Sequence, residues 1–354
     1  MSLLVGEAHV RLRDPIGYIA KVGEHLDTLN LSHEALPDGR RVTFSVGQAT
    51  LLAGDGLVAL RAEAEGLEQL ASLKNILIFQ MERLTEGEAL DVVWTGDGAD
   101  LRELPNFRPL KVLRVADITP HMRRVTLTGD DIARFESESI HVRMVIPEPG
   151  SPPAWPTLGA SGRPVWPEGA ARPALRTYTL RRVDLASREI DVDFVAHGDA
   201  GPGTRFARRA VPGDPVGMIG PGGGGMRSAD WNLFVGDETA LPAIGRLLER
   251  LPPTARGLAL IEVADEAERQ DLAHPPGLEL RWLYRNGIPA GQSAMLREAA
   301  LALELPETAS ISAWAGCEFA TFRALRTHWR EVWKLDRTQH LAVAYWRQGV
   351  AETA

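Results

Sequence analysis

The sequence of 354 residues is long enough for two or three domains, and its 44 % hydrophobic and 24 % charged residues exclude a fibrous or broadly disordered chain. A formal net charge of −8 disfavours nucleic acids and anionic membranes as partners. One cysteine, no early apolar stretch of the signal-peptide kind and no apolar run of roughly 18 residues together predict a cytoplasmic protein without disulfides or membrane helices.

Residues 1–96 are predicted to form a small α+β domain of unknown function. The segment AHVRL predicts a strand and residues 15–29 a helix. Three further strands, RVTFSV, ATLLAG and GLVALRAEA, are separated by Gly or Asp-Gly turns. Leucines at helical spacing predict a helix over 65–84, and DVVWT predicts a last strand. Residues 97–109 are polar and contain proline, which favours a linker.

Residues 108–228 contain six short strand candidates with turn signals between them, the pattern of an antiparallel β-barrel. The candidates are KVLRVADI, RRVTLTG, IHVRMVIP, LRTYTLRRV, EIDVDFVAHG and DPVGMIG. The Pro- and Gly-rich stretch between the third and fourth strands is too long for a tight hairpin and is expected to be a surface loop.

Residues 229–350 alternate between strand and helix patterns, from NLFVGD through LPAIGRLLERL to LAVAYW. Such alternation predicts an α/β domain with a parallel sheet covered on both faces. A β-barrel followed by an α/β domain of this kind suits a flavin reductase that binds a nicotinamide nucleotide. The expected fold is therefore multidomain, with an α+β domain, a six-stranded antiparallel barrel and a C-terminal α/β domain.

The strand segment RTYTLR, residues 176–181, is the strongest candidate for cofactor binding. Side chains alternate along a strand, so Arg176 and Tyr178 share one face, and Thr179 and Arg181 share the other. An aromatic ring can stack on an isoalloxazine, and arginine suits bidentate contact with phosphate. An edge strand with exposed arginines and a half-buried tyrosine is the alternative explanation.

Two glycine-rich turns can bring a backbone close to a ligand. One follows a strand at His197 and Gly198 and continues through Gly201, Gly203 and Thr204 into a helix-like segment, whose N–H groups can hold a pyrophosphate. The other contains Gly220 and Gly222, and it is either a ligand contact or a link between two domains.

Two strand ends in the α/β part carry further candidates. Asp237, Thr239 and Ala240 end the first strand, at the edge where open α/β sheets bind ligands. No G-x-G-x-x-G occurs there, and Thr239 can equally cap the following helix. Cys317 ends a later strand, either near a nicotinamide or as buried filler. A lone cysteine cannot by itself build a zinc or iron–sulfur site, so no resident metal is expected.

Taken in order, these motifs resemble the siderophore-interacting protein family of the ferredoxin-reductase-like superfamily over residues 108–349. The resemblance implies an FAD-binding barrel and an NAD(P)H-binding α/β domain. It implies that the RTYTLR strand and the turn from His197 to Thr204 belong to the flavin site, and that the turn around Asp237 meets the nucleotide. The family usually has glycine where this chain has Cys317. The segments that carry the resemblance are RTYTLR, HGDAGPGTRFA, IGPGG, GDETALPAI, WAGCE and YWRQG.

The activity implied is reduction of ferric siderophores to release Fe(II), with FAD passing electrons from NAD(P)H. Because many ferric siderophores are anionic and the chain is acidic, clustered cations are expected near the flavin, with Arg143 and Arg347 as substrate candidates. Both are equally explained as exposed surface arginines. A general NAD(P)H:flavin or ferredoxin-linked reductase and a non-enzymatic siderophore-binding protein are the alternative functions.

Overall fold

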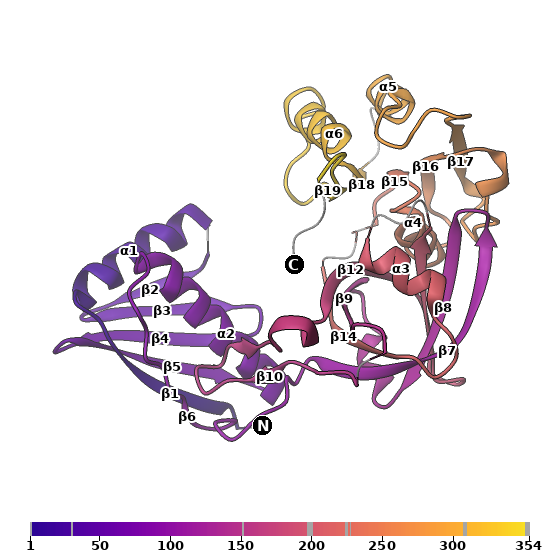
Figure 1. Cartoon of the computed structure of the whole chain (residues 1–354). Helices are drawn as coiled ribbons and strands as arrows, with labels where there is room; N and C mark the ends of the chain where they lie inside the picture. Colours follow the sequence, from indigo (N-terminus) through magenta and orange to yellow (C-terminus); the bar gives the residue numbers. More distant parts are fainter. Residues whose placement is uncertain are drawn as a thin grey trace. The chain divides into compact units, whose positions relative to one another are not determined.

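The computed structural model of the chain describes residues 2–29, 31–150, 152–196, 201–223, 226, 228–306 and 310–350. The chain divides into two compact units. The first comprises residues 1–107 and 154–172, and the second residues 108–153 and 173–354 (Figure 1). None of the helices in the described ranges is long and apolar enough to cross a membrane.

The first unit is a six-stranded antiparallel sheet with two helices on one face (Figure 1). Apolar side chains alternate along its strands and meet the apolar faces of both helices in one core. The sheet order is β2 (His33–Leu36), β3 (Gly39–Phe44), β4 (Gly47–Gly54), β5 (Leu57–Ala64), β1 (Leu4–Arg11) and β6 (Thr95–Gly96), and the helices are α1 (Pro15–Leu29) and α2 (Leu67–Leu84).

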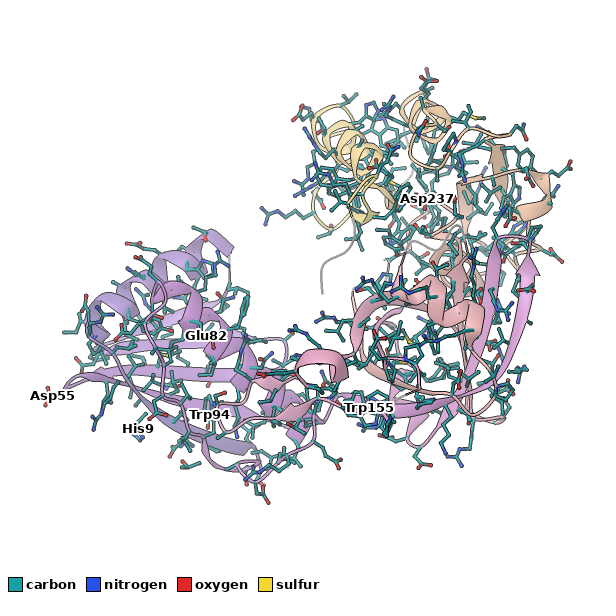
Figure 2. The ribbon with its side chains drawn as sticks, in the orientation of Figure 1. His9, Asp55, Glu82, Trp94, Trp155 and Asp237 are labelled. Carbon is teal, nitrogen blue, oxygen red and sulfur yellow. The ribbon has the colours of Figure 1, made fainter. Side chains whose placement is uncertain are left out.

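The expected strand DVVWT forms only in part, because β6 begins at Thr95. Trp94 is buried but pairs with a different segment: its backbone N–H donates to Ala160 (3.2 Å) and its indole N–H to Ser161 (3.0 Å). The short strand β2 was not predicted, because its four residues are too few to show a clear alternation. Figure 2 shows Trp94 among the side chains of this unit.

The expected surface loop is for the most part a packed element of the first unit. It forms a ribbon of β10 (Thr157–Leu158) and β11 (Pro164–Val165), followed by the 3-10 turn η2 (Gly169–Ala171). Arg163 pairs with Glu82 of α2 at 3.3 Å, and Glu103 bridges to Thr157. Residues 97–107, expected to be a linker, also belong to this unit.

The second unit begins with the predicted closed barrel of six antiparallel strands, in the order β12-β13-β8-β7-β14-β9. Its interior holds inward-facing apolar residues such as Leu127, Val192 and Met218. The elements are β7 (Phe107–Thr119), β8 (Met122–Gly129), the 3-10 turn η1 (Ile132–Phe135), β9 (His141–Ile146), β12 (Ala174–Asp184), β13 (Glu189–Val195), α3 (Pro202–Arg209) and β14 (Pro215–Gly222).

The rest of the second unit is the predicted parallel sheet, with five strands in the order β17-β16-β15-β18-β19. Helix α4 covers one face, where its core continues into barrel residues Met122 and Ile140, while α5 and α6 cover the other. The elements are β15 (Trp231–Asp237), α4 (Leu241–Glu249), β16 (Arg256–Val263), the 3-10 turn η3 (Glu266–Glu268), β17 (Gly277–Tyr284), α5 (Met295–Leu301), β18 (Ile311–Glu318), α6 (Phe319–Glu331) and β19 (His340–Trp346).

Candidate functional site

Strand β12 presents the expected alternation of side chains. Leu180 points into the barrel core, and Tyr178, two residues earlier, packs against the same core with its ring centroid 4.2 Å from that of Phe194. Arg176 is half-buried on this face and donates to the carbonyl of Leu175 at 2.6 Å. Thr179 is buried on the opposite side. Arg176 and Tyr178 therefore share a face, as predicted.

The first turn of α3 lies against Tyr178. A Cβ atom on Gly203 would fall 1.9 Å from the Tyr178 hydroxyl, so only glycine permits this approach. Gly201 precedes the helix, and no side chain in the described part of the chain caps its first turn. The N–H groups there are available to an anion. Thr204 instead donates its hydroxyl to the Val195 carbonyl at 3.3 Å. His197 and Gly198 lie outside the described residues.

The end of β14 supplies the second glycine-rich turn. Gly220 has a φ of +127°, a conformation that favours glycine, and its carbonyl accepts a hydrogen bond from Arg134 at 3.1 Å. A Cβ atom on Gly222 would meet open space. The two glycines therefore differ: the conformation of Gly220 requires glycine, whereas Gly222 leaves room beside an exposed backbone.

These groups fit a flavin dinucleotide. Tyr178 offers an aromatic surface, Arg176 a guanidinium, and the α3 first turn N–H groups beside a backbone that Gly203 keeps free of a side chain. A planar ring system and a pyrophosphate need these kinds of contact. FAD, when bound, converts the two electrons of a hydride into single electrons.

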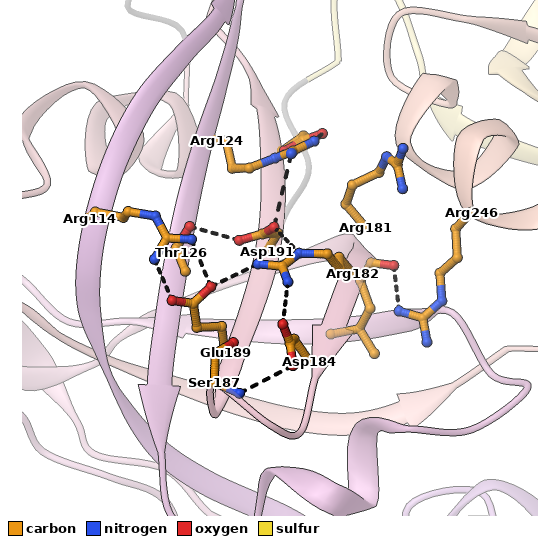
Figure 3. A network of polar contacts seen from close by, with 12 residues as sticks. Arg114, Arg124, Thr126, Arg181, Arg182, Asp184, Ser187, Glu189, Asp191 and Arg246 are labelled. Atoms are coloured by element: carbon orange, nitrogen blue, oxygen red, sulfur yellow. Dashed lines mark hydrogen bonds and ion pairs between the residues drawn. The ribbon is translucent and has the colours of Figure 1, made fainter. Parts of the chain in front are cut away.

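Arg181, which was predicted to contact FAD, forms an ion pair within the protein. Its guanidinium forms a bidentate pair with Glu249 of α4, at 3.1 and 2.8 Å. Nearby, Arg246 of α4 is buried and donates to the Leu180 carbonyl at 2.6 Å (Figure 3). Both arginines thus join barrel strand β12 to the first helix of the α/β part.

A charged network that the sequence did not reveal covers the outer face of the barrel (Figure 3). Arg182 donates to Asp184, Glu189 and Asp191 at 2.8, 2.8 and 2.7 Å. Arg114 of β7 reaches Glu189 of β13 across the intervening strand β8, and these hydrogen bonds lower the pKa of Glu189 to about 2. Because its charges are paired with one another, the network stabilises the strands and offers little to a substrate.

The turn after β15 is organised around the carboxylate of Asp237. It accepts hydrogen bonds from the Thr239 N–H and hydroxyl at 3.0 and 2.5 Å, from the Glu318 N–H at 3.1 Å and from the Trp346 indole at 2.8 Å. Burial, assisted by the neighbouring Glu238 charge, raises the pKa of Asp237 to about 6. The Thr239 hydroxyl therefore donates its hydrogen bond to Asp237, and Ala240 is the residue that immediately precedes α4.

A cavity opens beside this turn at the carboxyl ends of the parallel strands. Asp237, Glu238, Glu262 and Glu318 line it, and Arg285 is the one cation among its described lining residues. Arg285 forms a bidentate pair with Glu238, both distances being 2.7 Å. Carboxylates accept hydrogen bonds and repel phosphates, so this cavity of about 10 Å³ suits a single hydroxyl or amide group of a nucleotide.

Cys317 also lines this cavity but is fully buried, which raises the pKa of its thiol. Of the two interpretations, buried filler fits better, because a thiol so desolvated stays protonated and unreactive.

The two substrate candidates flank a contact between the barrel and the last strand. The Tyr345 hydroxyl of β19 lies 3.1 Å from His141 Nε2 of β9. Arg143 is exposed two residues after His141, and Arg347 is exposed two residues after Tyr345. The Arg347 guanidinium lies 4.8 Å from the centre of the Phe319 ring. The sequence did not identify His141, and it pointed to Glu318 and Trp346 only as members of the WAGCE and YWRQG segments, without a role for either.

Comparison with known proteins agrees with these features. A siderophore-interacting FAD-binding domain model matches residues 111–225, and a siderophore-interacting protein model matches residues 229–349. Residues 7–95 match an uncharacterized protein family conserved in bacteria.

Among individual relatives, the ferric vibriobactin reductase ViuB of Vibrio cholerae is 33 % identical over 252 residues, which cover 70 % of this chain and 92 % of ViuB. An NADPH-dependent ferric-chelate reductase of Escherichia coli is 36 % identical over 184 residues, covering 50 % of this chain and 71 % of that protein.

Among solved structures, the siderophore-interacting protein SipS from Aeromonas hydrophila is 35 % identical with a TM-score of 0.60, covering 70 % of this chain and 93 % of SipS. A siderophore utilization protein from T. fusca is 36 % identical with a TM-score of 0.61, covering 72 % of this chain and 98 % of that one. From these matches and the site geometry, the chain belongs to the siderophore-interacting protein family.

Proposed function

We propose that this protein is an FAD-dependent reductase that uses NAD(P)H to reduce ferric siderophores and release their iron as Fe(II). The observation that carries the proposal is the match of the barrel to the family's FAD-binding domain, in a chain 33 % identical to a protein named ferric vibriobactin reductase. The name of the E. coli relative, NADPH-dependent ferric-chelate reductase, supports NADPH as donor.

The chemistry of release follows from ligand preference. Siderophores hold iron with hard oxygen donors, which bind the smaller and more highly charged Fe(III) far more tightly than Fe(II). One electron therefore loosens the complex, and no acid–base group of the protein is needed for that step.

Different residues of this chain bind the cofactor, the nicotinamide nucleotide and the chelate. Tyr178, Arg176 and the first turn of α3 hold the cofactor, with Gly203 letting the helix approach the tyrosine. The carboxylates around Asp237 accept hydrogen bonds from hydroxyl and amide groups of the nicotinamide nucleotide. Exposed Arg143 and Arg347 attract the anionic chelate against a net charge of −8.

The place of action follows from the donor. NAD(P)H is regenerated inside the cell, and a chain with one buried cysteine and no intrachain disulfide suits a reducing compartment. We therefore assign the reaction to the cytoplasm. A protease-protection assay on intact and lysed cells of the producing organism tests this assignment.

An anaerobic stopped-flow experiment tests the function. NADH and NADPH are each mixed with the yellow protein to follow flavin bleaching, and ferric chelates are then added to follow its return. Fast bleaching and fast reoxidation by a ferric siderophore support the proposal. Three other outcomes indicate the alternative functions. If a ferric siderophore reoxidises the bound flavin no faster than free flavin does, the protein is a general flavin reductase. Bleaching only by reduced ferredoxin indicates a ferredoxin-linked enzyme, and chelate binding without flavin absorbance indicates a binding protein.

A further inference from the structure

The first unit contains a cavity between its helices and its sheet. Helices α1 and α2 lie on one face of the sheet (Figure 1), and a void of about 40 Å³ remains between them. Its walls are apolar, with Val22 and Leu26 from α1, Leu77 from α2, and Val42 and Leu51 from the sheet. Protein cores seldom leave a void larger than a water molecule, which needs roughly 10–15 Å³. This recess therefore has room for more than one small group.

Two polar side chains, one from each helix, reach the recess. His25 of α1 and Gln80 of α2 both line it. His25 Nε2 and Gln80 Oε1 are buried and have no hydrogen-bond partner among the described residues. Buried polar atoms in folded proteins are nearly always hydrogen-bonded, so a partner is expected from beyond the described residues, and a bound molecule can supply it. An amide oxygen only accepts, whereas an imidazole nitrogen donates or accepts according to its tautomer.

A hydroxyl group meets both requirements, because it donates one hydrogen bond and accepts others. Its oxygen can accept a hydrogen bond from His25 Nε2 in the neutral tautomer that carries the hydrogen on that atom, while its own hydrogen is donated to Gln80 Oε1. The surrounding walls are apolar, so the group that carries the hydroxyl must itself be apolar. A carboxylate is disfavoured there, because it has no proton to donate to Gln80.

A second, larger cavity of about 310 Å³ adjoins the recess, and Tyr18 and Leu84 line both. Four of its charged residues form ion pairs, Lys21 with Glu86 at 3.0 Å and Arg13 with Glu88 at 3.6 Å, and the Asp14 carboxylate accepts a hydrogen bond from the Gly17 N–H at 2.9 Å. A volume of this size is within the range of roughly 300–1,000 Å³ found for ligand sites. Because both of its cations are engaged by carboxylates and Asp14 adds a further negative charge, it disfavours an anion and suits an uncharged molecule.

We propose that the first unit binds a small uncharged alcohol or phenol. Its hydroxyl lies between His25 and Gln80, and its apolar body extends past Tyr18 and Leu84 into the outer cavity. This site is separate from the proposed reductase chemistry, since all of its residues belong to the first unit.

Phenol titrated into the full-length ¹⁵N-labelled protein tests the proposal by NMR. We expect saturable shifts of backbone amides in 18–26 and 76–84. The Gln80→Leu variant, which removes the acceptor but keeps the volume, should weaken phenol binding roughly five-fold. Gln69→Leu, the same change at an exposed position of α2, should leave it unchanged. Benzene, which lacks the hydroxyl, should bind the wild type at least five-fold more weakly than phenol.

Three results would overturn the proposal. One is the absence of saturable shifts with phenol at millimolar concentration, which means that water alone fills the recess. Another is equal affinity for phenol and benzene, which means that the recess is only an apolar void. The third is unchanged phenol affinity in a folded Gln80→Leu variant. If that variant does not fold, the wild-type comparison of phenol with benzene decides. Flavin reduction by NADPH should not respond to phenol, so this test is independent of the reductase proposal.

Discussion

The hydroxyl of Tyr345 lies 3.1 Å from Nε2 of His141, and the two rings meet edge to face. This hydrogen bond joins the last strand of the parallel sheet to barrel strand β9. Tyr345→Phe removes it and should lower the free energy of unfolding by about 1 kcal/mol, measured by urea denaturation. Tyr284→Phe, at the end of β17, is the matched control and should change little. Equal stability of wild type and Tyr345→Phe would mean that the contact contributes nothing.

The same histidine gives a pH dependence with a defined sign. Burial is the main cause of the lowered pKa of His141, so the folded state keeps this ring neutral below pH 6.5, where the unfolded chain takes up a proton. The unfolded state then binds more protons, and stability falls as pH drops from 6.5 toward the folded pKa. His141→Gln should reduce this slope in urea unfolding measured at a series of pH values. If the free energy of unfolding of wild type and of His141→Gln changed with pH by the same slope, His141 would not be the source of this pH dependence.

Gly203 and Gly201 form a matched pair for the cofactor site. Alanine at Gly203 places a methyl group against the Tyr178 hydroxyl, so Tyr178 must move; we expect Gly203→Ala to lose most of its FAD, at least ten-fold in affinity (roughly 1.4 kcal/mol). Gly201→Ala meets open space and has an extended φ of −146°, so it should retain FAD. Absorbance of the purified proteins at the flavin band measures both. If Gly201→Ala lost its FAD while Gly203→Ala retained it, the cofactor site would depend on Gly201 and not on Gly203.

Two arginines of β12 should differ in their effect on FAD. Arg176 shares the face of Tyr178, and Arg176→Ala should yield a folded protein with much less flavin. Arg181 is held by Glu249, so Arg181→Ala should keep its flavin and lose up to about 1 kcal/mol of stability, as expected for a partly exposed pair. Flavin content and thermal unfolding of each variant check this. Full retention of FAD by Arg176→Ala would exclude it as a phosphate ligand.

Arg143 and Arg347 are predicted to attract the anionic chelate. Their alanine variants should raise KM for an anionic ferric siderophore two- to five-fold, as expected from roughly 0.5–1 kcal/mol per exposed charge, and should weaken its dependence on salt. Flavin reduction by NADPH should not change. Arg326→Ala is the control, since Arg326 is also exposed and also lies over an aromatic ring. An unchanged KM in the double variant Arg143→Ala/Arg347→Ala would remove both residues from the substrate site.

The barrel and the parallel sheet were predictable because their strands carry regular apolar patterns with turn signals or helix patterns between them, and the ordered motifs led to the family. The partners of individual side chains could not be predicted. Nothing in the spacing of Arg181 reveals that Glu249, 68 positions later, would hold it. Likewise, no local pattern brings Trp346 to Asp237, because that contact arises only when β19 is laid beside β18. The segment around Trp94 was misread as a strand because a buried tryptophan looks the same whether it pairs with a sheet or with a distant loop.

The chain passes from one compact unit to the other three times, after Phe107, after Pro153 and after Arg172. A domain fused to the start of a reductase is ordinarily joined to it by one peptide segment, so that one cut by a protease separates the two. Here the first unit contains a piece that lies within the sequence of the barrel, so a cut after Phe107 leaves residues 1–107 held by the β10–β11 ribbon. A single break in the chain after Phe107 is therefore expected to leave the two parts associated, and limited proteolysis at that site should not separate them.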